Sequence, residues 1–221
     1  GRYCEAAEGF RACSDDPHLG AEALYHLGLA LTAMGEGAEA AEALARAWEA
    51  APADDTGLAL AQALLLAGDV DGASEALVKL TEPDEDAARL WHALAAARLA
   101  AGDEKAAKKA YGEAVRLGRQ ALATARELLG DEHPDVAQSL NNLGFFLSAQ
   151  GDYAEAERLY REALATYRRV AGDQSLGVAM TLNNLAVLLH TQGDYAGAEP
   201  LYRQALAIRR EPHAVRHADA L

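Results

Sequence analysis

Amphipathic helical segments alternate with short turns along the whole chain. Each turn begins with a glycine, and these glycines are Gly1, Gly35, Gly68, Gly102, Gly151 and Gly193. Their spacings are 34, 33, 34, 49 and 42 residues. Alanine is abundant and β-branched residues are few, which favours helices over strands. The pattern predicts an all-α protein of about eleven helices, at residues 2–14, 19–34, 37–51, 55–67, 70–81, 85–101, 104–129, 134–149, 153–171, 176–191 and 195–210.

The last part of the chain contains a tandem repeat of a 42-residue unit, at residues 132–173 and 174–215. Of the 42 aligned positions, 21 are identical, among them the paired asparagines and the Gly-Asp-Tyr turn. In each unit a first helix precedes the turn and a second helix follows it. Such a pair is too thin to bury its apolar face unless a neighbouring pair covers it. We therefore expect a single solenoid domain over residues 1–221.

Weaker copies of the unit precede the duplicated ones. The expected segments are the second half of a truncated repeat at 1–18, repeats at 19–52, 53–84, 85–131, 132–173 and 174–215, and the stub of a further repeat at 216–221. Small residues stand seven positions before the turn glycine, where two helices cross closely: Gly28, Ala61, Ala95, Gly144 and Ala186. Bulky residues stand nine positions after it, as packing knobs: Phe10, Leu44, Leu77, Tyr111, Tyr160 and Tyr202.

These spacings and residue types resemble those of tetratricopeptide repeat (TPR) proteins. The 42-residue copies, with their paired asparagines, Gly-Asp-Tyr turn and Pro200 within the second helix, resemble the kinesin light chain subtype. The resemblance implies a right-handed superhelix of antiparallel helix pairs. It also implies a scaffold that binds a peptide or a helix segment of a partner in a concave groove. Because partial repeats stand at both ends of the sequence, we expect the chain to be part of a longer multidomain protein.

In that architecture the first helices line the groove, and the turn glycines identify their exposed positions. The candidate binding residues are Tyr25, His26, Arg89, His92, Asn141, Asn142, Phe145, Asn183, Asn184, Val187 and His190. Further exposed positions are expected at Glu22, Leu29, Asp55, Leu58, Gln62 and Met180, among others. Asparagine offers a donor and an acceptor to the backbone of a bound peptide. In the alternative, one asparagine of each pair bonds a neighbouring helix and only holds the repeats in register.

The net charge of −14 comes from 34 acidic and 20 basic side chains. Residues 1–118 hold 21 of the acids and 10 of the bases. The negative electrostatic field of these acids repels phosphate backbones and anionic lipid, so we expect neither nucleic acid nor membrane as a partner. It favours a basic or amphipathic protein segment, although the acids also serve solubility. Arg89 alone is too little for a clamp that grips a free carboxylate.

No motif for catalysis, a cofactor or a metal ion stands out, so we expect no enzyme activity, no cofactor and no metal site. The histidines lack metal-ligand spacing. Cys4 and Cys13 are interpreted as buried and reduced. With no apolar run of membrane-spanning length and no signal peptide, the predicted location is cytoplasmic. The alternative function is a structural array that self-associates end to end by stacking repeat ends between chains.

Overall fold

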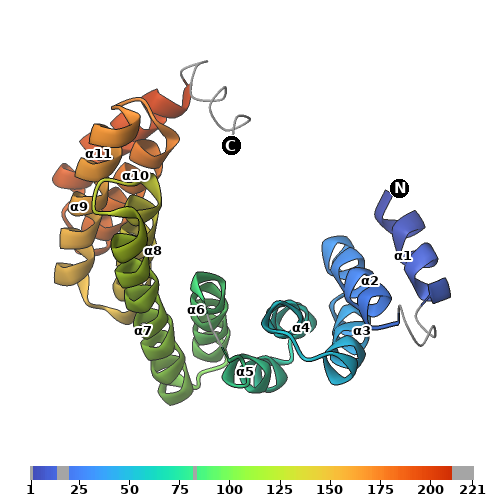
Figure 1. Cartoon of the computed structure of the whole chain (residues 1–221). Helices are drawn as coiled ribbons and strands as arrows, with labels where there is room; N and C mark the ends of the chain where they lie inside the picture. Colours follow the sequence, from blue (N-terminus) through green and yellow to red (C-terminus); the bar gives the residue numbers. More distant parts are fainter. Residues whose placement is uncertain (1, 14–19, 82–83, 211–221) are drawn as a thin grey trace. The chain divides into compact units, whose positions relative to one another are not determined.

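The computed structural model describes residues 2–13, 20–81 and 84–210. In these residues eleven α-helices and no strand occur (Figure 1), so the prediction of an all-α repeat fold is confirmed. The helices are α1 (Arg2–Cys13), α2 (Gly20–Met34), α3 (Gly37–Ala50), α4 (Asp54–Ala67), α5 (Val70–Val78), α6 (Glu85–Ala100), α7 (Glu104–Leu129), α8 (Pro134–Gln150), α9 (Tyr153–Ala171), α10 (Leu176–Thr191) and α11 (Tyr195–Arg210).

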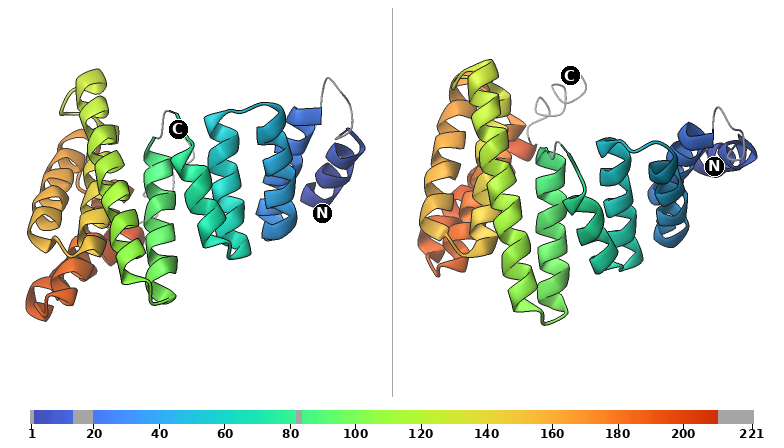
Figure 2. Two further views of the ribbon diagram at one scale, coloured as in Figure 1. Left: turned by 90° about the horizontal axis from the view of Figure 1, so that it is seen from below. Right: turned by 60° about the horizontal axis from the view of Figure 1, so that its bottom comes forward.

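The chain forms two compact units, which divide α7 between them. Unit 1 is Gly1–Ala114 and unit 2 is Val115–Leu221. In unit 1, α2 packs against α3 and α4 against α5, and the first helices α2, α4 and α6 also contact one another in succession (Figure 2). In unit 2, α8 packs against α9 and α10 against α11, while α8 contacts α10. Each unit therefore has a layer of first helices and a layer of second helices.

The Gly-Asp turns have a direct physical explanation. Gly68 ends α4 in the left-handed conformation, with φ of 82°, which costs a residue without a Cβ little. Asp69 then begins α5 as its N-cap, and its carboxylate accepts a hydrogen bond from the Gly72 backbone N–H at 2.9 Å. Gly151 and Asp152 repeat this arrangement between α8 and α9. The glycine stops one helix and the aspartate starts the next.

Close helix crossings occur at the small-residue positions, as predicted. Gly144 of α8 faces the ring of Tyr160, and a Cβ at Gly144 would lie 2.9 Å from Cε1 of that ring. Gly28 of α2 faces Leu44 of α3 in the same way, and a Cβ there would overlap the leucine. Tyr160 and Leu44 are themselves fully buried. In these two repeats the small residue and the bulky residue therefore form one contact.

Two expectations about unit 1 are wrong. Helix α5 ends at Val78 rather than at residue 81, because Thr81 donates its backbone N–H and hydroxyl to the Asp54 carboxylate of α4 at 3.0 and 2.9 Å. Cys4 and Cys13 are exposed rather than buried, because α1 packs mainly against α2 and most of its surface faces solvent. Among the helices described, none is long and apolar enough to cross a membrane.

Candidate functional site

The first helices of unit 1 line an open hollow of about 450 Å³. We call it the first-helix hollow, and its lining residues are Tyr25, Leu29, Asp55, Leu58, Ala59, Gln62, Asp86, Arg89 and Leu90. Helices α2, α4 and α6 each contribute to it. The sequence predicted six of these nine positions as exposed groove positions: Tyr25, Leu29, Asp55, Leu58, Gln62 and Arg89.

The hollow combines apolar surface with one carboxylate that lacks a partner. Leu29 is 39% exposed, and Tyr25 is half-buried beside it on α2. Arg89 is held by the Asp86 carboxylate at 2.8 Å. Asp55, in contrast, makes no ion pair or hydrogen bond with any other residue that the structure describes. An exposed carboxylate next to leucine and tyrosine side chains offers a contact for a cation that carries apolar groups.

The start of α6 explains where its charged groups lie. The Asp84 carboxylate caps this helix by accepting hydrogen bonds from the backbone N–H groups of Asp86 and Ala87, at 2.9 and 3.1 Å. This cap fixes the first turn, so Asp86 and Arg89 stand three residues apart on one face. The helical pattern did not identify the other three lining residues, Ala59, Asp86 and Leu90. The three-residue spacing from Arg89 is the signal that could have identified Asp86.

Two candidate histidines of unit 1 lie outside the lining of the first-helix hollow. The ring of His26 stacks on Phe10 of α1, with centroids 5.3 Å apart, and meets Tyr25 edge-on at 5.4 Å. His92 is half-buried and its ring packs edge-on against Tyr111 of α7, with centroids 5.5 Å apart. Burial lowers the pKa of His92 below its usual value. Each ring therefore contacts a neighbouring helix: His26 contacts α1 and His92 contacts α7.

In unit 2 the paired asparagines are not equivalent. Asn141 is only 5% exposed, so the expectation that it is an exposed position is wrong. Its side-chain oxygen accepts a hydrogen bond from the Asn184 amide of α10 at 3.1 Å. The alternative that one asparagine bonds a neighbouring helix is confirmed for this pair. Asn183, the counterpart of Asn141 in the second copy, is half-buried and makes no hydrogen bond with another described residue.

Large apolar side chains are exposed on the first helices of unit 2. Phe145 of α8 is 46% exposed, and Met180 and Val187 of α10 are 51% and 47% exposed. His190 is exposed near the end of α10, where its ring meets that of Tyr195 with centroids 4.9 Å apart. Asn142 is half-buried on α8. We call Phe145, Met180 and Val187 the unit 2 apolar wall.

The part of the chain that the structure describes contains no group of three or more His, Cys, Asp or Glu side chains that could hold a metal ion.

Models of the tetratricopeptide repeat match residues 31–97, 88–120, 106–135 and 135–211. Together these matches run without a gap from residue 31 to residue 211. No curated protein sequence gives a significant match.

Solved structures with the same fold include proteins of the kinesin light chain type. The kinesin light chain repeats of Podosopora anserina, described as nearly identical TPR-like repeats, have a TM-score of 0.67 at 23% identity, covering 85% of this chain and 94% of that one. BtubC (BKLC) from P. vanneervenii has a TM-score of 0.62 at 22% identity, covering 94% and 88%. YrrB, described as a TPR protein with an unusual peptide-binding site, has a TM-score of 0.51 at 15% identity, covering 97% and 100%.

Proposed function

The chain belongs to the tetratricopeptide repeat family, and on that premise we propose that it is a non-catalytic protein–protein interaction scaffold. Its first helices bind a peptide or a helix segment of a partner protein. The observation that carries this proposal is the first-helix hollow, because three successive helices contribute to one concave surface that holds both apolar and charged groups. YrrB, which has this fold, is described as having a peptide-binding site, and this supports the proposal by analogy.

Unit 1 binds a basic or amphipathic segment. Asp55 supplies a carboxylate without an internal partner, and Glu22 stands exposed on α2 with only His26 near it, at 3.9 Å. The only cation in the lining, Arg89, is already held by Asp86 and Glu85. A lysine or arginine of the partner would meet Asp55, while an adjacent apolar side chain would cover Leu29 and Leu58.

Unit 2 contributes a second surface, in which the apolar wall carries the contact. Phe145 and Val187 supply apolar area, and Asn183 supplies an amide without an internal partner. Asn141 and Asn184 are already bonded to each other, so their first role is to join α8 to α10. We therefore assign partner contacts to Phe145, Val187, Asn183, Asn142 and His190 ahead of Asn141.

The test of unit 1 uses three capped, fluorescent peptides in which leucine alternates with Lys, Gln or Glu. Fluorescence anisotropy measures their binding to the parent chain, to Asp55→Asn and to Leu29→Ser. The matched control is Val78→Ser, which removes a more exposed apolar side chain, 69% exposed against 39% for Leu29, from the second helix α5. We expect the Lys peptide to bind best. Asp55→Asn and Leu29→Ser should each weaken its binding, by about tenfold for the loss of a charged contact, whereas Val78→Ser should bind like the parent.

Equal binding of the Lys and Glu peptides would contradict the basic preference. If both Leu29→Ser and Val78→Ser bind the Lys peptide as tightly as the parent, the first-helix hollow is not the binding site. Circular dichroism of each variant confirms that the helices remain folded.

End-to-end self-association is a second candidate function, favoured by one observation on α11. Leu206 is 47% exposed, whereas Leu164, its counterpart in the first 42-residue copy, is 8% exposed because α10 packs over α9. An exposed leucine at a position that a neighbouring helix covers elsewhere is a site where another chain could stack. Chain mass measured across a dilution series tests this candidate, and Leu206→Ser should shift the mass to that of a monomer.

A further inference from the structure

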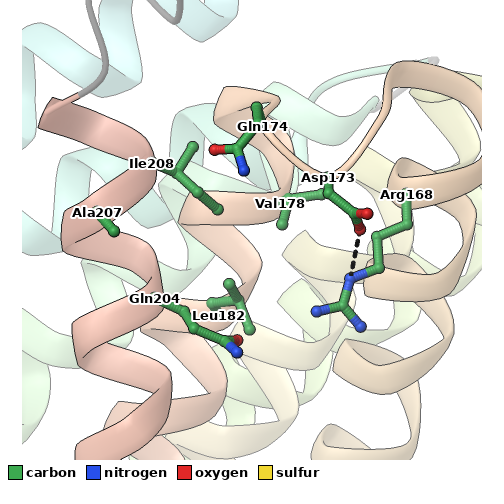
Figure 3. A pocket seen from close by; sticks show the side chains of 8 residues that line it. All are labelled: Arg168, Asp173, Gln174, Val178, Leu182, Gln204, Ala207 and Ile208. Atoms are coloured by element: carbon green, nitrogen blue, oxygen red, sulfur yellow. Dashed lines mark ion pairs between the residues drawn. The ribbon is translucent and has the colours of Figure 1, made fainter.

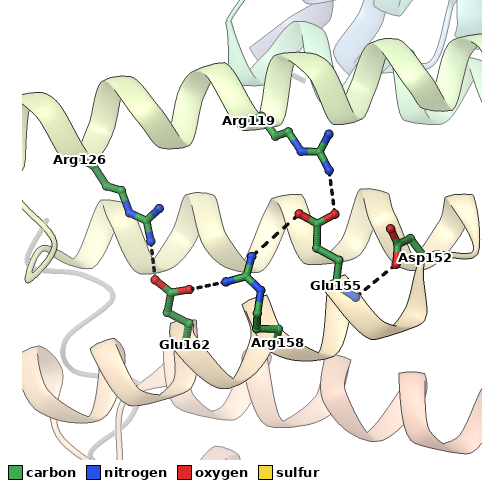
Figure 4. Close-up of polar contacts among 6 residues, drawn as sticks. All are labelled: Arg119, Arg126, Asp152, Glu155, Arg158 and Glu162. Carbon is green, nitrogen blue, oxygen red and sulfur yellow. Dashed lines mark hydrogen bonds and ion pairs between the residues drawn. The ribbon is translucent and has the colours of Figure 1, made fainter.

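A charged network joins the second helices α7 and α9 of unit 2 (Figure 4). Arg119 of α7 pairs with Glu155 of α9 at 2.7 Å, and Arg126 of α7 pairs with Glu162. Arg158 lies between the two acids, 3.9 Å from the Glu155 carboxylate and 3.2 Å from that of Glu162. Arginine–carboxylate pairs therefore bridge the groove between these two helices.

The second copy keeps the two arginines of α7 in this network and loses Arg158 and both acids. Forty-two residues after Arg119 and Arg126, α9 carries Arg161 and Arg168. Forty-two residues after the facing side chains, α11 carries Gly197 for Glu155, Pro200 for Arg158 and Gln204 for Glu162. In the groove between α9 and α11, α9 thus carries the two arginines, while these three positions of α11 carry no charge.

A hollow of about 340 Å³ lies at this place (Figure 3). We call it the Arg168 hollow, and its lining residues are Arg168, Asp173, Gln174, Val178, Leu182, Gln204, Ala207 and Ile208. Val178, Leu182 and Ile208 belong to the buried core of unit 2, so they form an apolar floor. Arg168, Asp173, Gln174 and Gln204 supply the polar groups that surround it, with Asp173 paired to Arg168.

Comparison of the two arginines shows what the Arg168 hollow lacks. Arg126 binds Asp131 of the following loop at 3.1 Å, and Arg168 binds Asp173 of its own following loop at 3.2 Å. Arg126 also binds Glu162, and no second carboxylate meets Arg168 among the described residues. A guanidinium has five N–H donors, so one carboxylate leaves it able to bind another.

We propose that the Arg168 hollow binds the carboxylate of an acidic segment of a partner protein, which takes the place that Glu162 occupies beside Arg126. Local charge supports an acidic partner. The last turns of α9 and α11 carry Arg168, Arg169, Arg209 and Arg210, although the whole chain is strongly acidic. Of these four, Arg169 pairs with Glu132 at 3.5 Å, and Arg209 and Arg210 pair with no other described residue.

Arg161 gives the site a second anchor. It precedes Arg168 by seven residues on α9, which is about 10 Å along a helix. Glu157 of its own helix binds it at 2.6 Å, and its side chain is 66% exposed. An extended segment with two acids three residues apart spans about the same 10 Å. The site is formed by the second helices α9 and α11 and by the start of α10, and it shares no residue with the first-helix hollow.

The duplicated sequence supplies the decisive variant, Gln204→Glu. This change restores the acid that stands at Glu162, so the chain would satisfy Arg168 by itself and close the site. The probe is a capped, fluorescent peptide with glutamates three residues apart among leucine and serine, and its counterpart has glutamine in place of glutamate. Anisotropy titrations compare the parent with Gln204→Glu, Arg168→Gln and Gln120→Glu. The last variant adds the same charge at an exposed position of α7.

We expect the parent and Gln120→Glu to bind the glutamate peptide and not its glutamine counterpart, with an affinity that falls as salt is added. Gln204→Glu and Arg168→Gln should each weaken binding about tenfold or more, as expected for the loss of a hydrogen bond to a charged group. Gln204→Glu should also raise the melting temperature, which separates a closed site from a misfolded variant. Equal binding of the two peptides, or unchanged binding by Gln204→Glu, would overturn the proposal.

Discussion

Replacement of Asn141 by alanine tests whether the paired asparagines hold the repeats together. The Asn141 side chain is 5% exposed, and its oxygen accepts the hydrogen bond from Asn184 at 3.1 Å. The chain itself supplies the matched control. Asn183→Ala removes the same side chain at the equivalent position of the second copy, where no hydrogen bond to a described residue is lost.

The size of the effect follows from burial at the two ends of the bond. A hydrogen bond inside a protein contributes about 0.5–1.5 kcal/mol net. Asn184 is half-buried, so water can reach its amide after the bond is lost, and the full penalty for an unsatisfied buried group does not apply. We expect Asn141→Ala to cost about 0.5–1.5 kcal/mol, or roughly 1–6 °C in the melting temperature of a chain of this size.

The assay is a double-mutant cycle read by urea unfolding and circular dichroism, with Asn141→Ala, Asn184→Ala and the double variant. The two changes should couple by about 0.5–1.5 kcal/mol, because the second removes nothing once the bond is broken. Asn183→Ala should stay within about 0.5 kcal/mol of the parent. If Asn141→Ala and Asn184→Ala each change the free energy of unfolding as little as Asn183→Ala does, and their effects simply add, this bond does not join α8 to α10.

Other predictions follow from packing and burial. Gly144→Leu should cost about 1–3 kcal/mol or more, because even a Cβ there would press on Tyr160; a melting curve like the parent's would show that the helix register is wrong. The free energy of unfolding should fall as the pH drops below about 6.5, because burial lowers the pKa of His92 in the folded chain and the unfolded chain takes up the proton first. His92→Gln should flatten that dependence in a pH series of urea titrations. A metal chelator or a thiol reductant should leave the melting curve unchanged, and a drop of many degrees with either would reveal a stabilising ion or cross-link.

The sequence predicts the helices closely because each boundary carries its own local signal. The bounds of α7, α9 and α10 and the start of α11 agree with prediction to the residue. Glycine in the left-handed conformation followed by a capping aspartate explains the starts of α7, α9 and α11, and Ser175 caps the start of α10. The end of α5 was mispredicted because a residue of the preceding helix, Asp54, binds Thr81. The local sequence pattern does not predict a contact between two helices.

The candidate site shows the same division between local pattern and contacts. Helical spacing placed Tyr25, Leu29 and Asp55 on the first-helix face, and the three residues line one hollow. Spacing could not separate Asn141 from Asn142, because neighbouring residues on a helix differ by about 100° and only the packing of α10 decides which of them is covered. The change from Glu162 to Gln204 was visible in the aligned copies, but its meaning needed the pairing of Glu162 with Arg126.

The central claim, that the first helices bind a partner segment, is tested most directly by methyl NMR of the 23.3 kDa chain with labelled leucine and valine. Leu29, Leu58 and Leu90 line the first-helix hollow, Leu44 and Leu77 are buried in second helices, and Val78 is exposed on α5. When the alternating Leu–Lys peptide is titrated in, the methyl signals of Leu29, Leu58 and Leu90 should shift together and saturate, while those of Leu44, Leu77 and Val78 stay in place. Saturable shifts confined to the second helices, or none at any position, would contradict the account.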